Sequence, residues 1–272
     1  MKTIVTHMNP DLDAVTSVWL FKRFGGPEFE DANVAFVPSG TTFKDMPVDS
    51  DLDIIHVDTG LGRLDHHQNN DYTCAAEKVF NYLKLSDPAL RRLIDLVVMV
   101  DHAKDLEWED SAHDKWELWL PAILTGYRLL HPEQYERHLT FGISALDGTY
   151  RSLQAKVEAE YELRKGTEFQ SRWGKAIACL TYNDTVLDVG IRCGYVLVAR
   201  KDPGKGYVRI TGSSKESVDL SAALAKFLQV DPNASWYLHP SKVLLRNGST
   251  KNPKMRPTSL TLDKIVEVLE EA

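Results

Sequence analysis

The first part of the chain alternates short apolar runs with stretches of helical periodicity. Residues 2–6, 33–37 and 53–57 have the length and composition of strands. Residues 11–24 lie between the first two runs and have a helical pattern, which Gly25-Gly26-Pro27 ends. This alternation favours an α/β fold with a mostly parallel sheet flanked by helices.

Two more helices are predicted downstream, at about residues 75–85 and at residues 88–100. Pro88 suits the first turn of the second helix, because its missing N–H is not needed there. The same helix has one apolar face, formed by Leu90, Leu93, Ile94, Val97 and Val98. Asp101 is therefore expected at the end of this helix, facing the sheet.

The pattern changes in the second half of the chain. No strong strand signal occurs between residues 132 and 172, and residues 153–164 form a charged, exposed helical pattern. We therefore predict a first α/β domain at residues 1–150, a helical connector at 151–173 and a smaller α/β domain at 174–272.

The last domain contains strand-like runs, a helix that ends near Leu228 and a capped amphipathic helix at residues 261–271. The strand-like runs lie at residues 177–180, 186–189, 195–199 and 207–210.

Large aromatic residues gather between residues 108 and 130, namely Trp108, Trp116, Trp119 and Tyr127. One interpretation is an aromatic wall on which a nucleobase stacks. The alternative, which we favour, is that these rings pack between helices in the core.

Composition and length limit the class of protein. The 272 residues are 43% hydrophobic and 26% charged, enough for one large domain or two ordinary ones. The three cysteines have no metal-ligand spacing, so reduced thiols are expected. The N-terminus lacks the charged and apolar regions of a signal peptide, and the best apolar run, residues 93–100, is too short to span a membrane. We therefore expect a cytoplasmic protein without a membrane partner.

The net charge of -7 is distributed unevenly. Residues 1–150 hold 25 acidic and 13 basic side chains, a net charge of -12, whereas residues 151–272 hold 14 and 19, a net charge of +5. An acidic half that attracts cations and a basic half that attracts anions suit a phosphorylated substrate. Ordinary variation in surface charge is the alternative.

Polar residues with metal-binding chemistry follow two predicted strands. His7, Asp11 and Asp13 come just after the first strand, and Asp58 ends the strand at residues 53–57. The triplet Asp65-His66-His67 follows seven residues later. Open α/β sheets place their ligands at the carboxyl ends of strands, so these side chains are expected in one pocket.

Carboxylates mixed with imidazoles suit first-row divalent ions such as manganese. Several carboxylates in one pocket repel one another unless cations neutralise them, and two divalent ions would do so. The alternative is that Asp11 and Asp13 only cap a helix next to Pro10. Capping does not explain His7 or the Asp-His-His triplet.

These motifs resemble those of the DHH phosphoesterase superfamily. The matching residues are His7-x-x-x-Asp11-x-Asp13, Asp58-Thr59-Gly60 and Asp65-His66-His67-Gln68, with Asp101 as the best match to the fourth motif. The superfamily includes oligoribonucleotide and bisphosphonucleotide phosphatases, single-strand exonucleases, cyclic-dinucleotide phosphodiesterases and family II inorganic pyrophosphatases. The resemblance covers the first half of the chain most strongly.

The resemblance implies a site with two divalent cations, with manganese favoured and magnesium or cobalt as alternatives. His7, Asp11 and Asp58 would hold one ion, and a second set of residues, including the bridging Asp58, would hold the other. That second set consists of Asp13, Asp58, His66 and Asp101. A water between the ions would attack phosphorus. His67 would protonate the leaving oxygen or bind phosphate, and Asp65 would orient His66 or His67.

The second half is similar to the substrate-binding domain that often accompanies DHH catalytic domains. Gly212-Ser213-Ser214 precedes a helix, but the Gly-Gly-His segment typical of that domain is missing. His239 is the candidate to replace it. We predict that residues of this domain bind the phosphate or nucleotide, namely His239, Lys242, Arg246 and Arg256. A solvated basic loop and an ordinary hairpin turn at Asn247-Gly248 are the alternatives.

The sequence thus predicts a metal-dependent phosphoesterase that acts on a small nucleotide phosphoester, either a short single-stranded RNA or DNA oligonucleotide or a bisphosphonucleotide. One alternative is a manganese-dependent inorganic pyrophosphatase, although Lys254-Met255-Arg256 is only loosely similar to the basic cluster of those enzymes. Another alternative is a non-catalytic nucleotide-binding module. No Walker-type phosphate loop and no convincing serine or cysteine nucleophile motif competes with metal-assisted hydrolysis.

Overall fold

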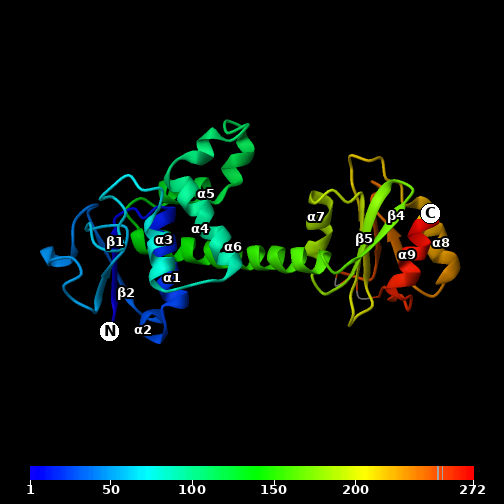
Figure 1. Cartoon of the computed structure of the whole chain (residues 1–272), viewed down its shortest axis with the longest axis horizontal. Helices are drawn as coiled ribbons and strands as arrows, with labels where there is room; N and C mark the ends of the chain where they lie inside the picture. The colour runs from blue at the N-terminus through cyan, green and yellow to red at the C-terminus, as the bar shows by residue number, and fades with distance from the viewer. Residues whose placement is uncertain (250, 253) are drawn as a thin grey trace. The chain divides into compact units, whose positions relative to one another are not determined.

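The computed structural model describes residues 1–249, 251–252 and 254–272, and the chain divides into two compact units. Unit 1 comprises Met1–Leu153 and unit 2 comprises Gln154–Ala272. The boundary falls inside one helix, α6 (Tyr135–Leu163). Figure 1 shows the elements of each unit.

Unit 1 is built on a parallel sheet of three strands in the order β2-β1-β3. These strands are β1 (Thr3–His7), β2 (Asn33–Val37) and β3 (Ile54–His56), as the apolar runs predicted. The first helices also match the prediction and are α1 (Leu12–Phe24), α3 (Ala75–Tyr82) and α4 (Pro88–Asp101). A short helix, α2 (Pro27–Glu30), follows α1. The sheet, helices and order of elements in unit 1 confirm a mixed α/β fold with a parallel sheet.

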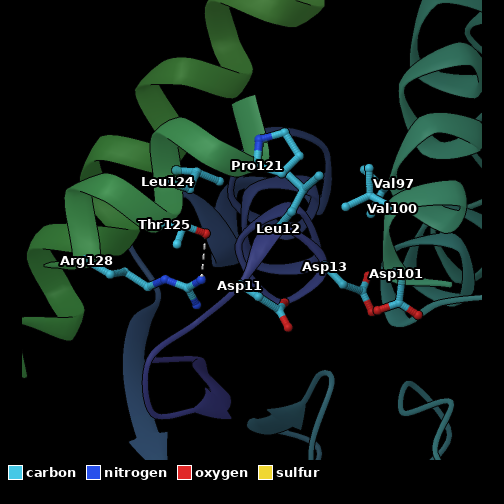
Figure 2. A pocket seen from close by; sticks show the side chains of 10 residues that line it. All are labelled: Asp11, Leu12, Asp13, Val97, Val100, Asp101, Pro121, Leu124, Thr125 and Arg128. Atoms are coloured by element: carbon cyan, nitrogen blue, oxygen red, sulfur yellow. Dashed lines mark hydrogen bonds between the residues drawn. The ribbon is translucent and has the colours of Figure 1, made fainter. Parts of the chain in front are cut away.

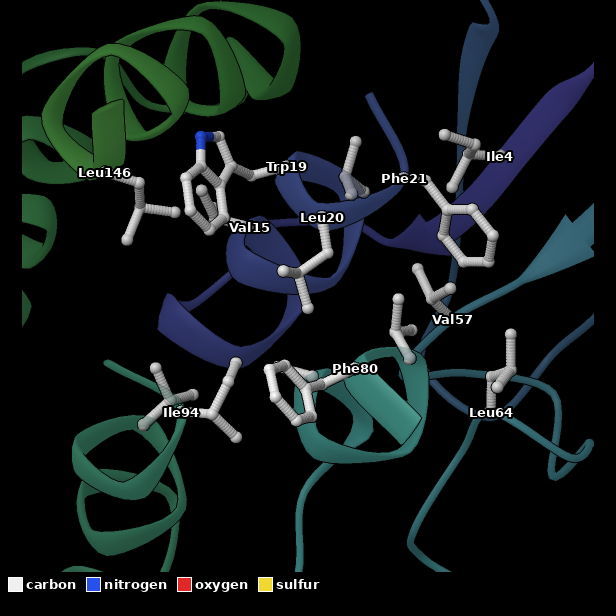
Figure 3. Packing of buried hydrophobic residues seen from close by; sticks show 14 of the residues in the cluster. Ile4, Val15, Trp19, Leu20, Phe21, Val57, Leu64, Phe80, Ile94 and Leu146 are labelled. Carbon is white, nitrogen blue, oxygen red and sulfur yellow. The ribbon is translucent and has the colours of Figure 1, made fainter. Parts of the chain in front are cut away.

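The core of unit 1 fills the space between this sheet and its helices. Trp19, Leu20 and Phe21 of α1 are fully buried among residues of β1, α3 and α4 (Figure 3). The indole Nε1 of Trp19 donates a hydrogen bond of 2.8 Å to Asp147 of α6. This bond fixes α6 against α1, because a buried indole N–H needs an acceptor.

Short helices connect α4 to α6. They are η2 (Lys104–Glu107), η3 (Asp114–Leu118) and α5 (Leu120–Leu130); another, η1 (Phe43–Asp45), lies between β2 and β3. The rings of Trp108, Trp116 and Trp119 contact one another, with centroids 5.0 to 6.5 Å apart. All three side chains are partly buried. The three rings therefore pack on one another within this connection, but none of them belongs to the buried core of unit 1, where the favoured interpretation had placed them.

Unit 2 contains a six-stranded sheet in the order β4-β5-β6-β7-β9-β8. Its strands are β4 (Thr167–Ser171), β5 (Gly174–Leu180), β6 (Leu197–Lys201), β7 (Val208–Gly212), β8 (Trp236–Leu238) and β9 (Leu244–Asn247). One face packs on α8 (Ser221–Val230) and α9 (Leu262–Glu270), and α7 (Thr185–Arg192) lies on the other face (Figure 1). Only β5 and β6 pair in parallel; the other described pairs are antiparallel.

Two predictions for the second half were wrong. Residues 186–189 belong to helix α7 rather than to a strand, because Val186, Val189 and Gly190 are spaced to bury one face of a helix. Strand β4 lies where no strand was expected. Its exposed positions include the polar Glu168 and Gln170, so an edge strand gave only a weak apolar pattern.

The long helix α6 was predicted only in part. The charged pattern at residues 153–164 lies almost wholly within it, but the helix begins at Tyr135. Within the described residues, no helix is both long and apolar enough to cross a bilayer.

Candidate metal centre

The first group of candidate ligands lies where β1 meets α1. His7 is the last residue of β1, and Asp11 caps α1 by accepting a hydrogen bond of 3.1 Å from the Ala14 amide. Asp11 Oδ2 lies 3.9 Å from His7 Nε2. The capping interpretation is therefore correct for one oxygen of Asp11, and the other oxygen still faces the histidine.

The tautomer of His7 suits metal binding. Its Nδ1 lies 2.8 Å from the carbonyl oxygen of Met8, which can only accept, so Nδ1 carries a proton. Its Nε2 points to Asp58, with Oδ2 at 3.1 Å. In the neutral ring Nε2 is therefore unprotonated, and its lone pair is available to a metal ion. The Met8 carbonyl fixes the orientation of the ring, as hydrogen-bond acceptors beside metal-bound histidines do.

Asp13 is buried in the first turn of α1 and is held by another helix. Its two oxygens accept hydrogen bonds of 2.8 and 2.7 Å from the amides of Ala75 and Ala76, in the first turn of α3. Free amides at a helix start bind anions well, so this position suits a carboxylate. Asp13 is thereby fixed before any ligand arrives.

Asp58 lies at the centre of the site, shortly after β3. Its backbone is left-handed, with φ of 55°, a conformation that aspartate tolerates better than most residues. The side chain is 3% exposed. Its Oδ2 contacts His7, and its Oδ1 lies 3.5 Å from His66 Nε2.

The triplet Asp65-His66-His67 separates into different environments. His66 Nε2 lies 3.6 Å from Asp13 Oδ2 and 3.6 Å from Asp101 Oδ2, so it points into the acidic cluster. His67 is half-exposed, and its Nδ1 donates a 2.7 Å hydrogen bond to Asp65 Oδ1. Asp65 is buried, and it also accepts bonds from the amides of Leu61 and His67. Asp65 thus orients His67 rather than His66.

The predicted metal ligands come together in three groups of donor atoms. Within each group the donor atoms lie within 4.8 Å of one another, and Asp58 belongs to two of the groups. The groups are His7 with Asp11 and Asp58, Asp13 with His66 and Asp101, and Asp58 with His66 and His67. Asp101 is the last residue of α4, where the helical pattern placed it.

The charges in this cluster perturb one another. Burial raises the pKa of Asp13 well above its ordinary value, and repulsion from Asp58 and Asp101 raises it further. Burial likewise raises the pKa of Asp101. Burial opposes ionisation of Asp58 too, but contacts with His66 and His7 outweigh it and lower the pKa.

The two histidines show the complementary effect. The contact with Asp58 is the main reason that the pKa of His66 is raised to about 9, against the effect of burial. Burial would lower the pKa of His7, but the bonds to Asp58 and Met8 and the charge of Asp11 outweigh it and raise the pKa to about 9. The cluster therefore attracts positive charge, which protons or divalent cations can supply.

The residues fit divalent cations. Oδ1 of Asp58 is buried and has no hydrogen-bond partner in the described part of the chain, so one of its lone pairs is available to a ligand. Carboxylate oxygens and imidazole nitrogens are together suited to manganese and similar ions. No cysteine joins the groups found among the described residues; Cys74 is buried beside Asp13, and burial raises the pKa of its thiol.

The sequence reasoning missed one residue of this site, Arg128. A cavity of about 230 Å³ is lined by Asp11, Asp13 and Asp101 and also by Arg128 of α5. Figure 2 shows Arg128 extending from its helix toward the side of Asp11, while Asp13 and Asp101 face each other. Its guanidinium donates to Asn9 O at 3.2 Å and to Thr125 Oγ1 at 3.1 Å. No signal in the sequence could have identified it, since a lone arginine carries no motif.

The predicted substrate-binding residues all belong to unit 2, where they differ in environment. Arg246 lies on β9 and is exposed, and His239 Nδ1 is 2.8 Å from Ser241 Oγ. Lys242 donates a 2.8 Å bond to Asp219, which lowers the pKa of that carboxyl. The backbone of Arg256 bonds to Ser235 and Asn247. Their role in substrate binding stays a prediction.

The fold and the site define unit 1 as an α/β domain that carries a candidate site for divalent cations beside a parallel sheet. A family model described as the C-terminal domain of ChrB matches residues 4–152, more than half of the chain. The chain therefore belongs to the family of the ChrB C-terminal domain. The matching model is thus not one of the DHH superfamily, which the sequence motifs resemble.

Solved structures that align with this chain include RecJ from Thermus thermophilus in complex with Mg2+, at 14% identity and a TM-score of 0.34, covering 99% of this chain and 49% of RecJ. The RecJ complex with Mn2+ aligns at 14% identity and a TM-score of 0.34, covering 99% of this chain and 52% of RecJ. The DHH domain of a protein described as a member of a ribosomal protein family aligns at 11% identity and a TM-score of 0.35, covering 99% of this chain and 86% of that chain. The chain thus spans about half the length of the RecJ chains. None of the curated proteins matches.

Proposed function

We propose that unit 1 is a metal-dependent phosphoesterase that hydrolyses a small nucleotide phosphoester. The observation that carries the proposal is the convergence of histidines and aspartates into three donor groups that are linked through Asp58 and His66. A shared carboxylate between two donor groups is the arrangement that suits a pair of divalent ions. The short oligonucleotide or bisphosphonucleotide that the motifs suggest is the proposed substrate.

The ligands divide between two positions. His7, Asp11 and Asp58 would hold one ion, and Asp13, Asp58, His66 and Asp101 the other. Manganese is the proposed ion, because imidazole and carboxylate occur together at each position. Two such ions, when bound, would supply a nucleophile from water at neutral pH and would polarise the phosphoryl oxygens.

The remaining residues have roles of their own. His67 Nδ1 is occupied by Asp65, so Nε2 is the atom that exchanges a proton with the leaving oxygen. Asp65 positions that ring. Arg128 lines the same cavity as three acids and provides the positive charge that a phosphate oxygen needs there.

A substrate panel tests the proposal. The full chain is assayed with Mn2+ against a dinucleotide, a bisphosphonucleotide, a cyclic dinucleotide and pyrophosphate, each with and without a chelator. Chelator-sensitive release of phosphate or nucleotide from one of the first three supports the proposal. Hydrolysis of pyrophosphate alone would instead establish the pyrophosphatase alternative, and ion-dependent nucleotide binding without turnover would leave the non-catalytic module.

A further inference from the structure

Three arginines line up across one face of the sheet in unit 2. Arg200 of β6 lies directly opposite Arg209 of β7, and Arg209 lies directly opposite Arg246 of β9. Tyr237 of β8 lies opposite Arg246 at the edge of the sheet. Directly opposed residues on paired strands share a face, so these four side chains form one row. We call Arg200, Arg209 and Arg246 the arginine row.

The row lies on the face that α7 covers only in part. Alternating residues of the same strands, such as Leu197, Ile210 and Leu245, pack under α8 and α9 on the opposite face. Val198, two residues before Arg200, packs with α7. Beyond α7 the row becomes progressively more open: the side chain of Arg200 is 5% exposed, that of Arg209 is 25% exposed, and Arg246 is exposed.

The row carries more positive charge than its described partners neutralise. Asp184 pairs with both Arg200 and Arg209, and Asp202 lies 3.6 Å from Arg200 Nη1. Nε and Nη1 of Arg200 are buried and have no hydrogen-bond partner among the described residues. A buried guanidinium with unused donors costs free energy unless a further acceptor or an anion compensates it.

The open end of the row borders a hollow. Arg246 and Tyr237 line a cavity of about 530 Å³ together with Lys254. Within the described residues, no hydrogen bond or ion pair engages the guanidinium of Arg246. An unpaired arginine, a lysine and an exposed tyrosine ring thus line one hollow, which is a combination suited to phosphates that carry bases.

We propose that the arginine row binds a linear chain of phosphates, with its phosphates on Arg209, Arg246 and Lys254. Neighbouring strands are about 4.8 Å apart, so cations on β6, β7 and β9 repeat along one line rather than converge on one point. One anion bridges two neighbouring cations, as the Asp184 carboxylate does for Arg200 and Arg209, so a longer line of cations needs more than one phosphate. Arg200 is too buried for such contact and acts through its charge. This site lies wholly in unit 2 and does not depend on hydrolysis in unit 1.

Binding by the full chain is measured with a labelled single-stranded oligothymidylate of about 12 nucleotides, a length within the range of known single-strand sites, and separately with inorganic polyphosphate. Both measurements are made in EDTA so that no hydrolysis intervenes. Three phosphate contacts give a slope of log K against log salt of about -2. Each contact removed reduces the magnitude of that slope by about 0.7. At about 0.1 M salt, this corresponds to about a fivefold loss of affinity. Arg209→Gln and Arg246→Gln are each expected to lose about fivefold, and the double variant about 25-fold.

Arg172→Gln is the matched control, because Arg172 is exposed near the β4 edge and bonds the carbonyl of Ala272. It should bind as the wild type does. Arg246→Gln removes no described side-chain bond, so its fold is preserved even if Arg209→Gln unfolds unit 2. Unchanged binding by Arg246→Gln, an equal loss in Arg172→Gln, or no binding of either probe by the wild type would overturn the proposal.

Tyr237→Ala distinguishes the two sources of a phosphate chain. If the ligand is a single-stranded nucleic acid, this variant loses about fivefold or more in affinity for the oligothymidylate, because a stacked base is lost. If the ligand is polyphosphate, the oligothymidylate binds weakly in the wild type and Tyr237→Ala leaves polyphosphate binding unchanged. Either result supports the arginine row as a site for linear phosphates.

Discussion

Replacing Asp58 by Asn should strongly reduce the response of the protein to divalent ions without disturbing its backbone. Oδ2 of Asp58 lies 3.1 Å from His7 Nε2 and its Oδ1 lies 3.5 Å from His66 Nε2, so this substitution affects a carboxylate that faces both proposed ion positions. Its φ of 55° lies in the left-handed region, which Asn adopts readily. Asp58→Ala would add backbone strain of about 1 to 2 kcal/mol, so Asn is the cleaner variant.

The magnitude follows from linkage between binding and folding. If the ions bind with a Kd about one-thousandth of their concentration, they stabilise the folded state by about 4.1 kcal/mol. For a unit of about 150 residues, that raises Tm by roughly 8 to 16 °C. Binding weakened by about 100-fold in Asp58→Asn would leave about 1.4 kcal/mol, or about 3 to 6 °C.

The assay is thermal unfolding of wild type and variant with EDTA and with Mn2+, together with metal analysis of the purified chains. Asp45→Asn is the matched control, since Asp45 also has a left-handed φ, of 56°, but is exposed and outside every donor group found among the described residues. It should respond to Mn2+ as the wild type does. If Asp58→Asn kept two ions and the full rise in Tm, the shared-carboxylate assignment would be refuted.

Four other substitutions test separate parts of unit 1. His67→Gln should keep the ion-dependent rise in Tm and lose turnover by roughly 10²- to 10⁴-fold, whereas His66→Gln should lose both; equal metal loss in the two variants would contradict their assignment. Arg128→Gln should raise KM more than it lowers kcat and weaken inhibition by phosphate at unchanged metal content, and a purely structural role would instead lower Tm alone. Asp147→Ala should destabilise unit 1 by about 1 to 3 kcal/mol, measured by denaturant unfolding, because Trp19 loses its acceptor. The hydrogen bond from Arg23 lowers the pKa of Asp147, so the stability that this carboxylate contributes is present above its unfolded pKa of about 3.9 and is lost as the pH falls through its lower pKa in the folded state. An equal loss of stability at acid pH in Asp147→Ala would contradict this.

The candidate site was predictable where local sequence and strand ends coincide. His7 and Asp58 follow apolar runs that had to become neighbouring strands, and parallel strands bring their carboxyl ends to one edge. Asp101 was predictable because helical spacing fixes the end of α4. The pairing of Asp65 with His67 rather than His66 was not, since it depends on a turn that only tertiary packing selects.

Unit 2 was harder to predict, because its decisive features lie between strands that are distant in sequence. The arginine row requires the register of β6, β7 and β9, and register is set by packing against α8 and α9. Strand β4 was missed because its exposed side is polar, and residues 186–189 were assigned to a strand because a short apolar run fits either element.

The two hydrogen bonds between Asp13 and the start of α3 limit which sequences this family can tolerate there. Proline is generally favoured in the first turn of a helix, as Pro88 of α4 illustrates. Positions 75 and 76 are different, because each contributes the amide hydrogen that holds Asp13. Both side chains are also fully buried, which leaves little room for anything larger than alanine. In evolution, selection for the site should therefore act on two alanines that have no chemistry of their own.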